Sequence, residues 1–239
     1  MTGTPRCSCF QRFQVSLPLV SHSALLIVCC YTAGLTDLLV VSTPISSTHL
    51  DVHLPFPLAY LYWFTAPSRS SEPDTTIPPS LLVSSTHTLT QLVLPCCAEY
   101  DRSLLPALIT VAPNLTFFSF TRITTRPGSL PALQLMKRLQ HLYFAGPPKG
   151  LSEVLEALPE ETKLSTLRVH DIPTMFSSRL QTQRVPRYKP VIACLAHVAL
   201  ALLQELELVF EEEHQKAGWY KPMKTECKRR KIIIRQVLY

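Results

Sequence analysis

Cysteine and histidine are the first candidates for chemistry in this sequence, because a thiolate beside a base can act as a nucleophile. Cys194 and His197 stand three residues apart, a spacing that places two side chains on one face of a helix. The other residues between 193 and 199 are all apolar. An apolar setting favours a packed pair in the core, so we expect no activated cysteine here.

Other catalytic and metal-binding patterns are missing from the sequence. The eight cysteines include three close pairs but no C-x-x-C, and no histidine follows them at zinc-finger spacing. His214 follows an acidic run at 211–213 without forming the metal-binding motif H-E-x-x-H. The adjacent carboxylates of Glu160 and Glu161 are most simply interpreted as surface residues. The six glycines form neither G-x-G nor G-x-S-x-G. We therefore expect no enzyme, no metal site and no cofactor.

Composition and charge narrow the class of protein. Apolar residues make up 46% of the 239 positions and charged residues 17%, which excludes wholesale disorder. The net charge of +6 is uneven, because residues 216–239 carry +7 and the rest −1. A neutral body argues against a nucleic-acid partner. The basic tail is either a solvated helix face or a patch for nuclear import or an acidic partner, built on Lys228–Lys231.

The N-terminal region must be considered as a membrane segment or signal peptide, because Val15 to Thr36 contains no Asp, Glu, Lys or Arg. Serine, proline and histidine interrupt the run, which disfavours a spanning helix. One interpretation makes 15–33 a signal peptide or anchor, and only then would the Asn114-Leu115-Thr116 sequon matter. We prefer the interpretation without a membrane, and adjacent cysteines such as Cys29–Cys30 fit a reducing compartment.

A repeated leucine pattern predicts the strands and helices that would position any functional residue. Leu-x-x-Leu-x followed by an apolar residue, once in relaxed form, begins at positions 35, 58, 89, 115, 139, 164 and 203. Three consecutive spacings, of 26, 24 and 25 residues, fall in the range of leucine-rich repeats. The alternative is a set of ordinary amphipathic segments in an α/β domain.

Each repeat unit predicts one strand and one short helix. Alternation at 92–94 and 142–144 is typical of a strand, whereas Leu151, Val154, Leu155 and Leu158 follow helical spacing, with Ser152 as the expected N-cap. Pro131 and Pro190 suit first helical turns. Such a unit cannot bury its apolar face alone, but stacked copies can, which predicts a parallel βα arrangement. Leu92, Phe118, Leu142 and Leu167 should then lie on adjacent strands.

Five segments resemble leucine-rich repeats: HTLTQLVLP (87–95), APNLTFFSF (112–120), MKRLQHLYFAG (136–146), TKLSTLRVHDI (162–172) and LLQELELVF (202–210). More narrowly, they are similar to the irregular repeats that follow the F-box in fungal substrate receptors. ECKRRKIII (226–234) resembles the basic helix and last strand that end such proteins. Typical repeats also carry Asn or Cys five residues after the second leucine, where here only Cys97 fits.

The resemblance implies an α/β fold, a leucine-rich-repeat-like βα solenoid over 35–239 with its parallel sheet on the concave face and a basic C-terminal end. Residues 1–34 would be an N-terminal segment, either an F-box remnant or a cap. The implied function is a non-catalytic protein–protein interaction scaffold, in the form of an F-box-type substrate receptor of a cullin ubiquitin ligase. Its partners would be a protein on the concave face and a ubiquitin-ligase adaptor, and we expect a cytoplasmic or nuclear monomer. The alternative is a secreted or membrane-anchored leucine-rich repeat recognition protein.

The expected binding face follows from strand alternation. Residues between the inward leucines point to the opposite, concave face, and aromatic and arginine side chains are the usual anchors of interfaces. The predicted partner-binding residues are Tyr60, Tyr62, Phe117, His141, Tyr143, Arg168 and His170. The alternative is that flanking loops pack some of these side chains.

Overall fold

The computed structural model describes residues 25–32, 35–42, 58–65, 79–94, 104–121, 130–171, 187–210 and 212–237. Within these ranges the chain forms nine strands: β1 Leu25–Thr32, β2 Leu35–Ser42, β3 Tyr60–Thr65, β4 Gln91–Val93, β5 Phe117–Thr121, β6 His141–Ala145, β7 Thr166–His170, β8 Glu205–Val209 and β9 Ile233–Val237. Six α-helices alternate with most of them: α1 Pro79–Ser84, α2 Leu104–Val111, α3 Leu130–Leu133, α4 Leu151–Glu156, α5 Lys189–Cys194 and α6 Tyr220–Arg230.

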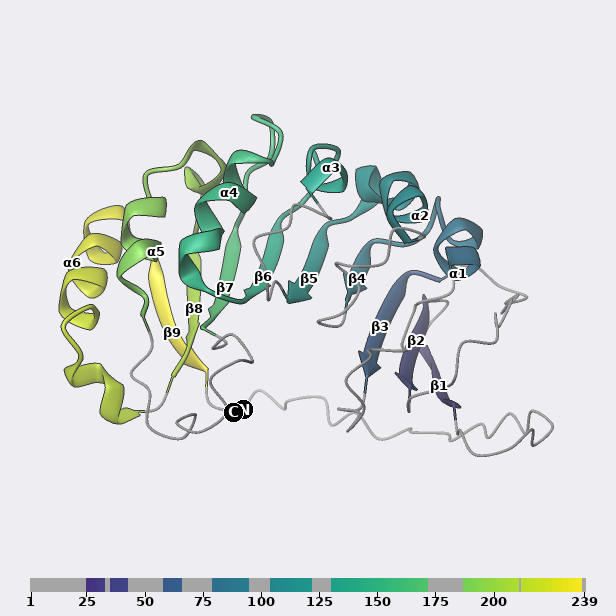
Figure 1. The fold of residues 1–239 in the computed structure, drawn as a ribbon, viewed down its shortest axis with the longest axis horizontal. Helices are drawn as coiled ribbons and strands as arrows, with labels where there is room; N and C mark the ends of the chain where they lie inside the picture. Colours follow the sequence, from purple (N-terminus) through teal and green to yellow (C-terminus); the bar gives the residue numbers. More distant parts are fainter. Residues whose placement is uncertain are drawn as a thin grey trace, which may run out of the picture.

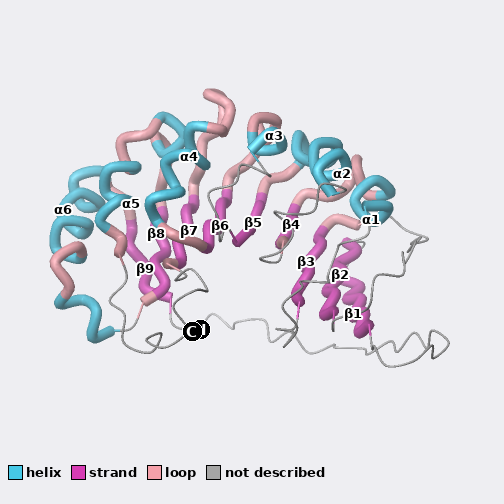
Figure 2. Tube along the Cα trace, viewed as in Figure 1, coloured by secondary structure: helices cyan, strands magenta, loops and turns pink. Residues whose placement is uncertain are grey.

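All nine described strands belong to one sheet whose spatial order is the order of the chain. β1 and β2 pair antiparallel, and every later neighbour pair, from β2–β3 to β8–β9, is parallel. The sheet curves, with the helices in an outer row and the strands in an inner one (Figures 1 and 2). The prediction of an α/β fold with a parallel sheet is confirmed.

A row of apolar side chains holds neighbouring units together. Leu92 pairs with Phe118, Phe118 with Leu142, and Leu142 with Leu167, so the predicted register is confirmed. The row extends to Leu206, and all five side chains are at most 1% exposed. Because each of these residues fills the space between the sheet and the helix row, burial there stabilises the packing of each unit on the next.

The amino-terminal ends of the strands share a repeated hydrogen-bond pattern. The carbonyl oxygen of Thr116 accepts bonds from the N–H groups of Gln140 (2.9 Å) and His141 (3.0 Å). The carbonyl oxygen of Gln140 in turn accepts bonds from Ser165 (2.8 Å) and Thr166 (3.1 Å). The same doubly accepting carbonyl recurs at Ala59, Thr90 and Ser165. Each unit is thereby tied to the unit before it through the backbone.

Threonine hydroxyl groups add side-chain hydrogen bonds between neighbouring units, which the leucine pattern does not predict. Thr88 donates to the carbonyl oxygen of Leu58 at 2.7 Å, and the fully buried Thr162 donates to that of Met136 at 3.0 Å. The position expected from typical repeats, Cys97, lies outside the described residues. In both cases the threonine hydroxyl reaches a carbonyl oxygen of the preceding unit and joins the two units by a hydrogen bond.

The short helices begin largely as expected. Pro190 lies in the first turn of α5 and Pro131 in that of α3, where a missing N–H costs no hydrogen bond. The prediction of Ser152 as the N-cap of the next helix is wrong, because α4 starts at Leu151 and Gly150 holds the cap position. The Ser152 hydroxyl instead bonds the Glu156 carboxylate one turn later, at 2.8 Å.

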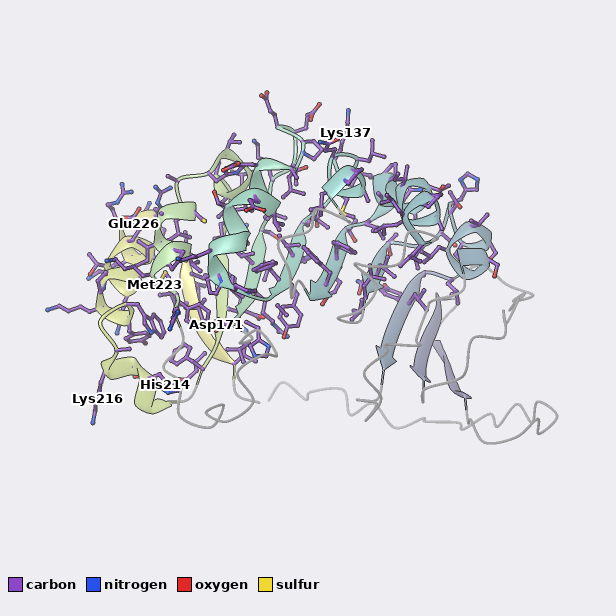
Figure 3. All side chains as sticks on the ribbon, viewed as in Figure 1. Lys137, Asp171, His214, Lys216, Met223 and Glu226 are labelled. Carbon is purple, nitrogen blue, oxygen red and sulfur yellow. The ribbon has the colours of Figure 1, made fainter. Side chains whose placement is uncertain are left out.

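Tyr188 joins the carboxyl ends of two strands. Its fully buried hydroxyl lies 2.6 Å from the carbonyl oxygen of Val209 and 3.2 Å from that of Val169. It also accepts a bond from the Asp171 N–H at 3.2 Å, while the Asp171 carboxylate accepts one from Arg187 N–H at 2.7 Å (Asp171 is labelled in Figure 3). These bonds tie the residues after β7 to those before α5.

Aromatic rings close the C-terminal end of the core. The Trp219 ring packs edge-on against Tyr188, Phe210 and Tyr220 at centroid distances of 5.0, 5.2 and 5.6 Å. α6 buries Met223 and Cys227 below Trp219 and ends at Lys231, whose φ of 60° closes the helix in the left-handed conformation. The expected basic helix followed by a last strand is confirmed as α6 and β9.

Several expectations concern the N-terminal region. Leu25–Thr32, part of the segment considered as a signal or anchor, is a strand whose residues pair with Leu35–Ser42. Residues 1–24, which include most of the expected F-box remnant, and residues 172–186, between β7 and α5, lie outside the described residues.

Candidate functional face

Alternate residues of the strands form two rows on the face of the sheet opposite the helices. The first row, in register, comprises Tyr60, Gln91, Phe117, His141, Thr166, Glu205 and Ile233. The second comprises Tyr62, Val93, Ser119, Tyr143, Arg168, Glu207 and Arg235. The curvature of the sheet makes this the concave face (Figure 1).

The first row begins with aromatic rings. Tyr60, Phe117 and His141 are partly exposed, as expected for residues that face away from the helices. The rings of Phe117 and His141 are tilted at 36° with centroids 6.5 Å apart. Tyr62 lies on β3 in the second row, and its side chain is outside the description. The middle of the face is therefore a partly exposed aromatic surface.

The second row holds Arg168 in a fixed position. Its guanidinium carbon lies 5.3 Å from the centroid of the Tyr143 ring, a cation–π contact, and its Nε pairs with the Glu207 carboxylate. Burial raises the pKa of Tyr143 above its usual value, against the opposing influence of the Arg168 charge. Tyr143 and Glu207 flank Arg168 on β6 and β8, so its guanidinium needs little ordering when a partner binds.

His170 differs from the other predicted contact residues, because its side chain is only 8% exposed. Its Nδ1 lies 3.2 Å from the Tyr143 hydroxyl, and burial lowers the pKa of the imidazole despite the neighbouring Asp171 carboxylate. The expectation that His170 lines an open surface is wrong. It supports Tyr143 from the carboxyl end of the adjacent strand.

A second ion pair, which the sequence analysis did not single out, joins Glu205 to Arg235 on β8 and β9. Glu205 and Glu207 alternate on β8 so that both face the concave side, and each meets an arginine of a neighbouring strand. Register places Glu207 directly opposite Arg168, whereas Glu205 reaches Arg235 diagonally, since Ile233 stands opposite Glu205. The alternating Glu-Leu-Glu of β8 was the signal that could have found both pairs. The charges on this end of the face are thus balanced within the sheet.

The cysteine and histidine considered for chemistry occupy separate structural roles. Burial raises the pKa of Cys194, which disfavours the thiolate. The Nδ1 atom of His197 accepts a bond from the Ala199 N–H at 3.2 Å and so caps a short 3-10 helix. Among the described residues, no group of three metal-ligating side chains comes together.

Asn114 of the sequon is engaged within the fold. Its side-chain amide donates to the carbonyl oxygen of Thr86 at 2.8 Å, across to the preceding unit. The next residue, Leu115, is fully buried. A glycan on this amide nitrogen would replace that hydrogen bond with a bulky group beside the core.

Comparison with known proteins finds no family model, no curated protein and no solved structure that matches the chain. In the described part of the chain, no helix combines the length and apolar character that crossing a membrane demands, and the longest, α6, has 11 residues. The function is therefore inferred from the geometry of the concave face.

Proposed function

We propose that this protein is a non-catalytic interaction scaffold, a leucine-rich-repeat-like solenoid that captures a protein partner on its concave face. The observation that carries the proposal is the arrangement of Tyr143, Arg168 and Glu207 on three adjacent strands. A stacked and paired arginine beside partly exposed aromatic rings matches the composition of interface hot spots. Parallel strands in chain order give that surface its length.

The partner is expected to bridge two chemically different halves of the face. Tyr60, Phe117 and His141 offer aromatic surface for burial of apolar side chains. Arg168 keeps guanidinium donors beyond the one that it shares with Glu207, and these suit carbonyl or carboxylate acceptors. Because the ion pairs are balanced within the sheet, apolar burial supplies most of the affinity, and hydrogen bonds to Arg168 supply orientation.

The narrower proposal is an F-box-type substrate receptor of a cullin ubiquitin ligase, working in the cytoplasm or nucleus. It rests on the sequence resemblance, and the free, buried thiols of Cys194 and Cys227 are compatible with a reducing compartment. Co-purification of the full chain with a cullin-ligase adaptor supports this role. A soluble, monomeric chain that brings down no adaptor overturns the ligase role and leaves the scaffold proposal standing.

The test of the concave face compares three forms of the tagged full chain in quantitative affinity capture. The double variant Tyr143→Ala/Arg168→Ala should lose the captured partner. The control, Lys149→Ala/Glu160→Ala, changes exposed residues beside the helix row and should retain it. The thermal midpoints of all three forms are measured in parallel. Equal capture by all forms, or loss of capture only in proportion to unfolding, overturns the proposal.

A further inference from the structure

The terminal helix α6 has two faces of opposite character. Met223 and Cys227 point into the core and are at most 1% exposed. Lys221, Lys224 and Lys228 follow one another at intervals of three and four residues, and all three are exposed. In Figure 3, Met223 is labelled on the inner side of α6, and Lys216, just before the helix, extends away from the fold. We call the three exposed lysines of α6 the lysine stripe.

The two arginines of α6 share one carboxylate, whereas no ion pair among the described residues engages the stripe. The Glu226 carboxylate binds Arg229 at 2.5 and 2.9 Å and Arg230 at 2.6 Å. Glu226 is the one acidic residue of α6, and both of its oxygens are engaged by these arginines. The stripe is left as a line of cations about 10 Å long, from the helical rise per residue.

Helix stability does not explain the stripe. Cations near the C-terminus of a helix are favoured by its dipole, which accounts for Lys228 and the arginines. Lys221 lies in the first turn, where the dipole disfavours a cation and where α6 has no acidic residue. Like charges three and four residues apart also repel. These lysines therefore cost folding stability slightly, and an anionic partner would remove the repulsion.

The chemistry around the stripe distinguishes between anionic partners. A bilayer needs an apolar residue to insert or a second anchor, and none of the large exposed hydrophobic residues of the described chain lies on α6. A nucleic-acid site usually spreads its positive charge over a working face and adds aromatic stacking. Here the positive charge is confined to the C-terminal residues 216–239, and the rest of the chain carries a net charge of −1.

An extended acidic polypeptide fits the stripe better. Alternate side chains of an extended strand lie about 7 Å apart on one side. The lysines advance along α6 by about 4.5 and 6 Å, and their flexible side chains cover the difference. We propose that the lysine stripe of α6 binds an extended acidic segment of a protein partner. This site lies on the outer side of the last helix, apart from the concave face, so its failure would leave the proposed function untouched.

The experiment uses the full chain and a fluorescent synthetic peptide of alternating glutamate and serine. The peptide should bind, more weakly as salt rises. The triple variant Lys221→Gln/Lys224→Gln/Lys228→Gln should bind about tenfold more weakly, taking about two- to threefold for each exposed ion pair. The matched control, with the exposed Lys137, Lys149 and Lys189 changed to Gln, should bind as the wild type does. Far-ultraviolet circular dichroism verifies that both variants are folded.

Two further probes test the choice of partner. A single-stranded RNA of the same charge and phosphatidylserine vesicles should both bind the chain less tightly than the peptide. Tighter binding of either probe overturns the proposal in favour of that partner class. Absence of peptide binding at low salt, or equal weakening in both triple variants, overturns the site itself.

Discussion

The Tyr188 hydroxyl offers the sharpest test of how the C-terminal units are held together. Phe at this position keeps the ring packed against Trp219 and removes only the oxygen. The carbonyl of Val209 and the N–H of Asp171 then lose their bonds to that oxygen inside the protein. The perturbation therefore separates hydrogen bonding from aromatic packing.

The expected magnitude follows from those two groups. A net hydrogen bond is worth about 1 kcal/mol, and a buried polar group left unpaired costs about 1–3 kcal/mol. We expect Tyr188→Phe to lower the free energy of unfolding by about 2 kcal/mol. For a chain of this size, that corresponds to a fall of about 4–8 °C in the thermal midpoint.

Urea unfolding and thermal melts of the full chain provide the measurement. Tyr220→Phe is the matched control, since Tyr220 belongs to the same aromatic cluster and is partly exposed. Its loss of a hydroxyl should change stability by less than about 0.5 kcal/mol. If both variants are equally stable, the Tyr188 hydroxyl does not hold the two strands, and the reasoning fails.

Two further predictions concern titratable groups near the C-terminus. Hydrogen bonds from Arg229 and Arg230 lower the pKa of Glu226 to about 2. An unfolded carboxyl group binds its proton at about pH 4.3, so the contribution of Glu226 to stability is present above that pH and is lost as the pH falls toward 2. Glu226→Gln should therefore be less stable than wild type at neutral pH and equally stable near pH 2 in urea titrations, and a constant gap would contradict this. Burial, reinforced by the Glu226 charge, raises the pKa of Cys227 to about 11. Peptide mapping after iodoacetamide treatment near neutral pH should find Cys227 unmodified in the folded chain and alkylated in urea, and rapid native labelling would refute its burial.

The strand register was the most predictable part of the structure. Leucine spacing placed Leu92, Phe118, Leu142 and Leu167 on neighbouring strands because a slip of one residue would turn every inward side chain to the other face. Proline marked helix starts for a similarly local reason. Pattern alone was sufficient where one physical requirement, burial or a missing N–H, decided the outcome.

Features that depend on contacts between units could not be predicted from the sequence. His170 alternates with Arg168 as a concave residue should, but its side chain is buried and its Nδ1 contacts the Tyr143 hydroxyl. Ser152 has the chemistry of an N-cap, yet α4 starts one residue earlier. The oxygen of Tyr188 meets three backbone groups separated from it by 17 to 21 residues. Such partners become visible only when the strands are placed side by side.

The residue types on the candidate face were predictable from the sequence, but the pairing of their charges was not. Tyr143 and Arg168 were expected on adjacent strands, and they are in contact. The pairing of both β8 glutamates with arginines of neighbouring strands was missed because charge along one segment says nothing about charge across a sheet. That balance favours a partner that buries apolar surface on the aromatic part of the face.

The agreement between strand order and chain order has a consequence for how the protein is made. Every strand from β2 onward pairs with the strand that precedes it in the sequence. During synthesis the emerging chain therefore meets a finished template each time another strand leaves the ribosome, and no strand has to wait for a distant segment. Assembly can advance in one direction, and Tyr188 joins β7 to β8 only after the segment between β7 and α5 has been synthesised.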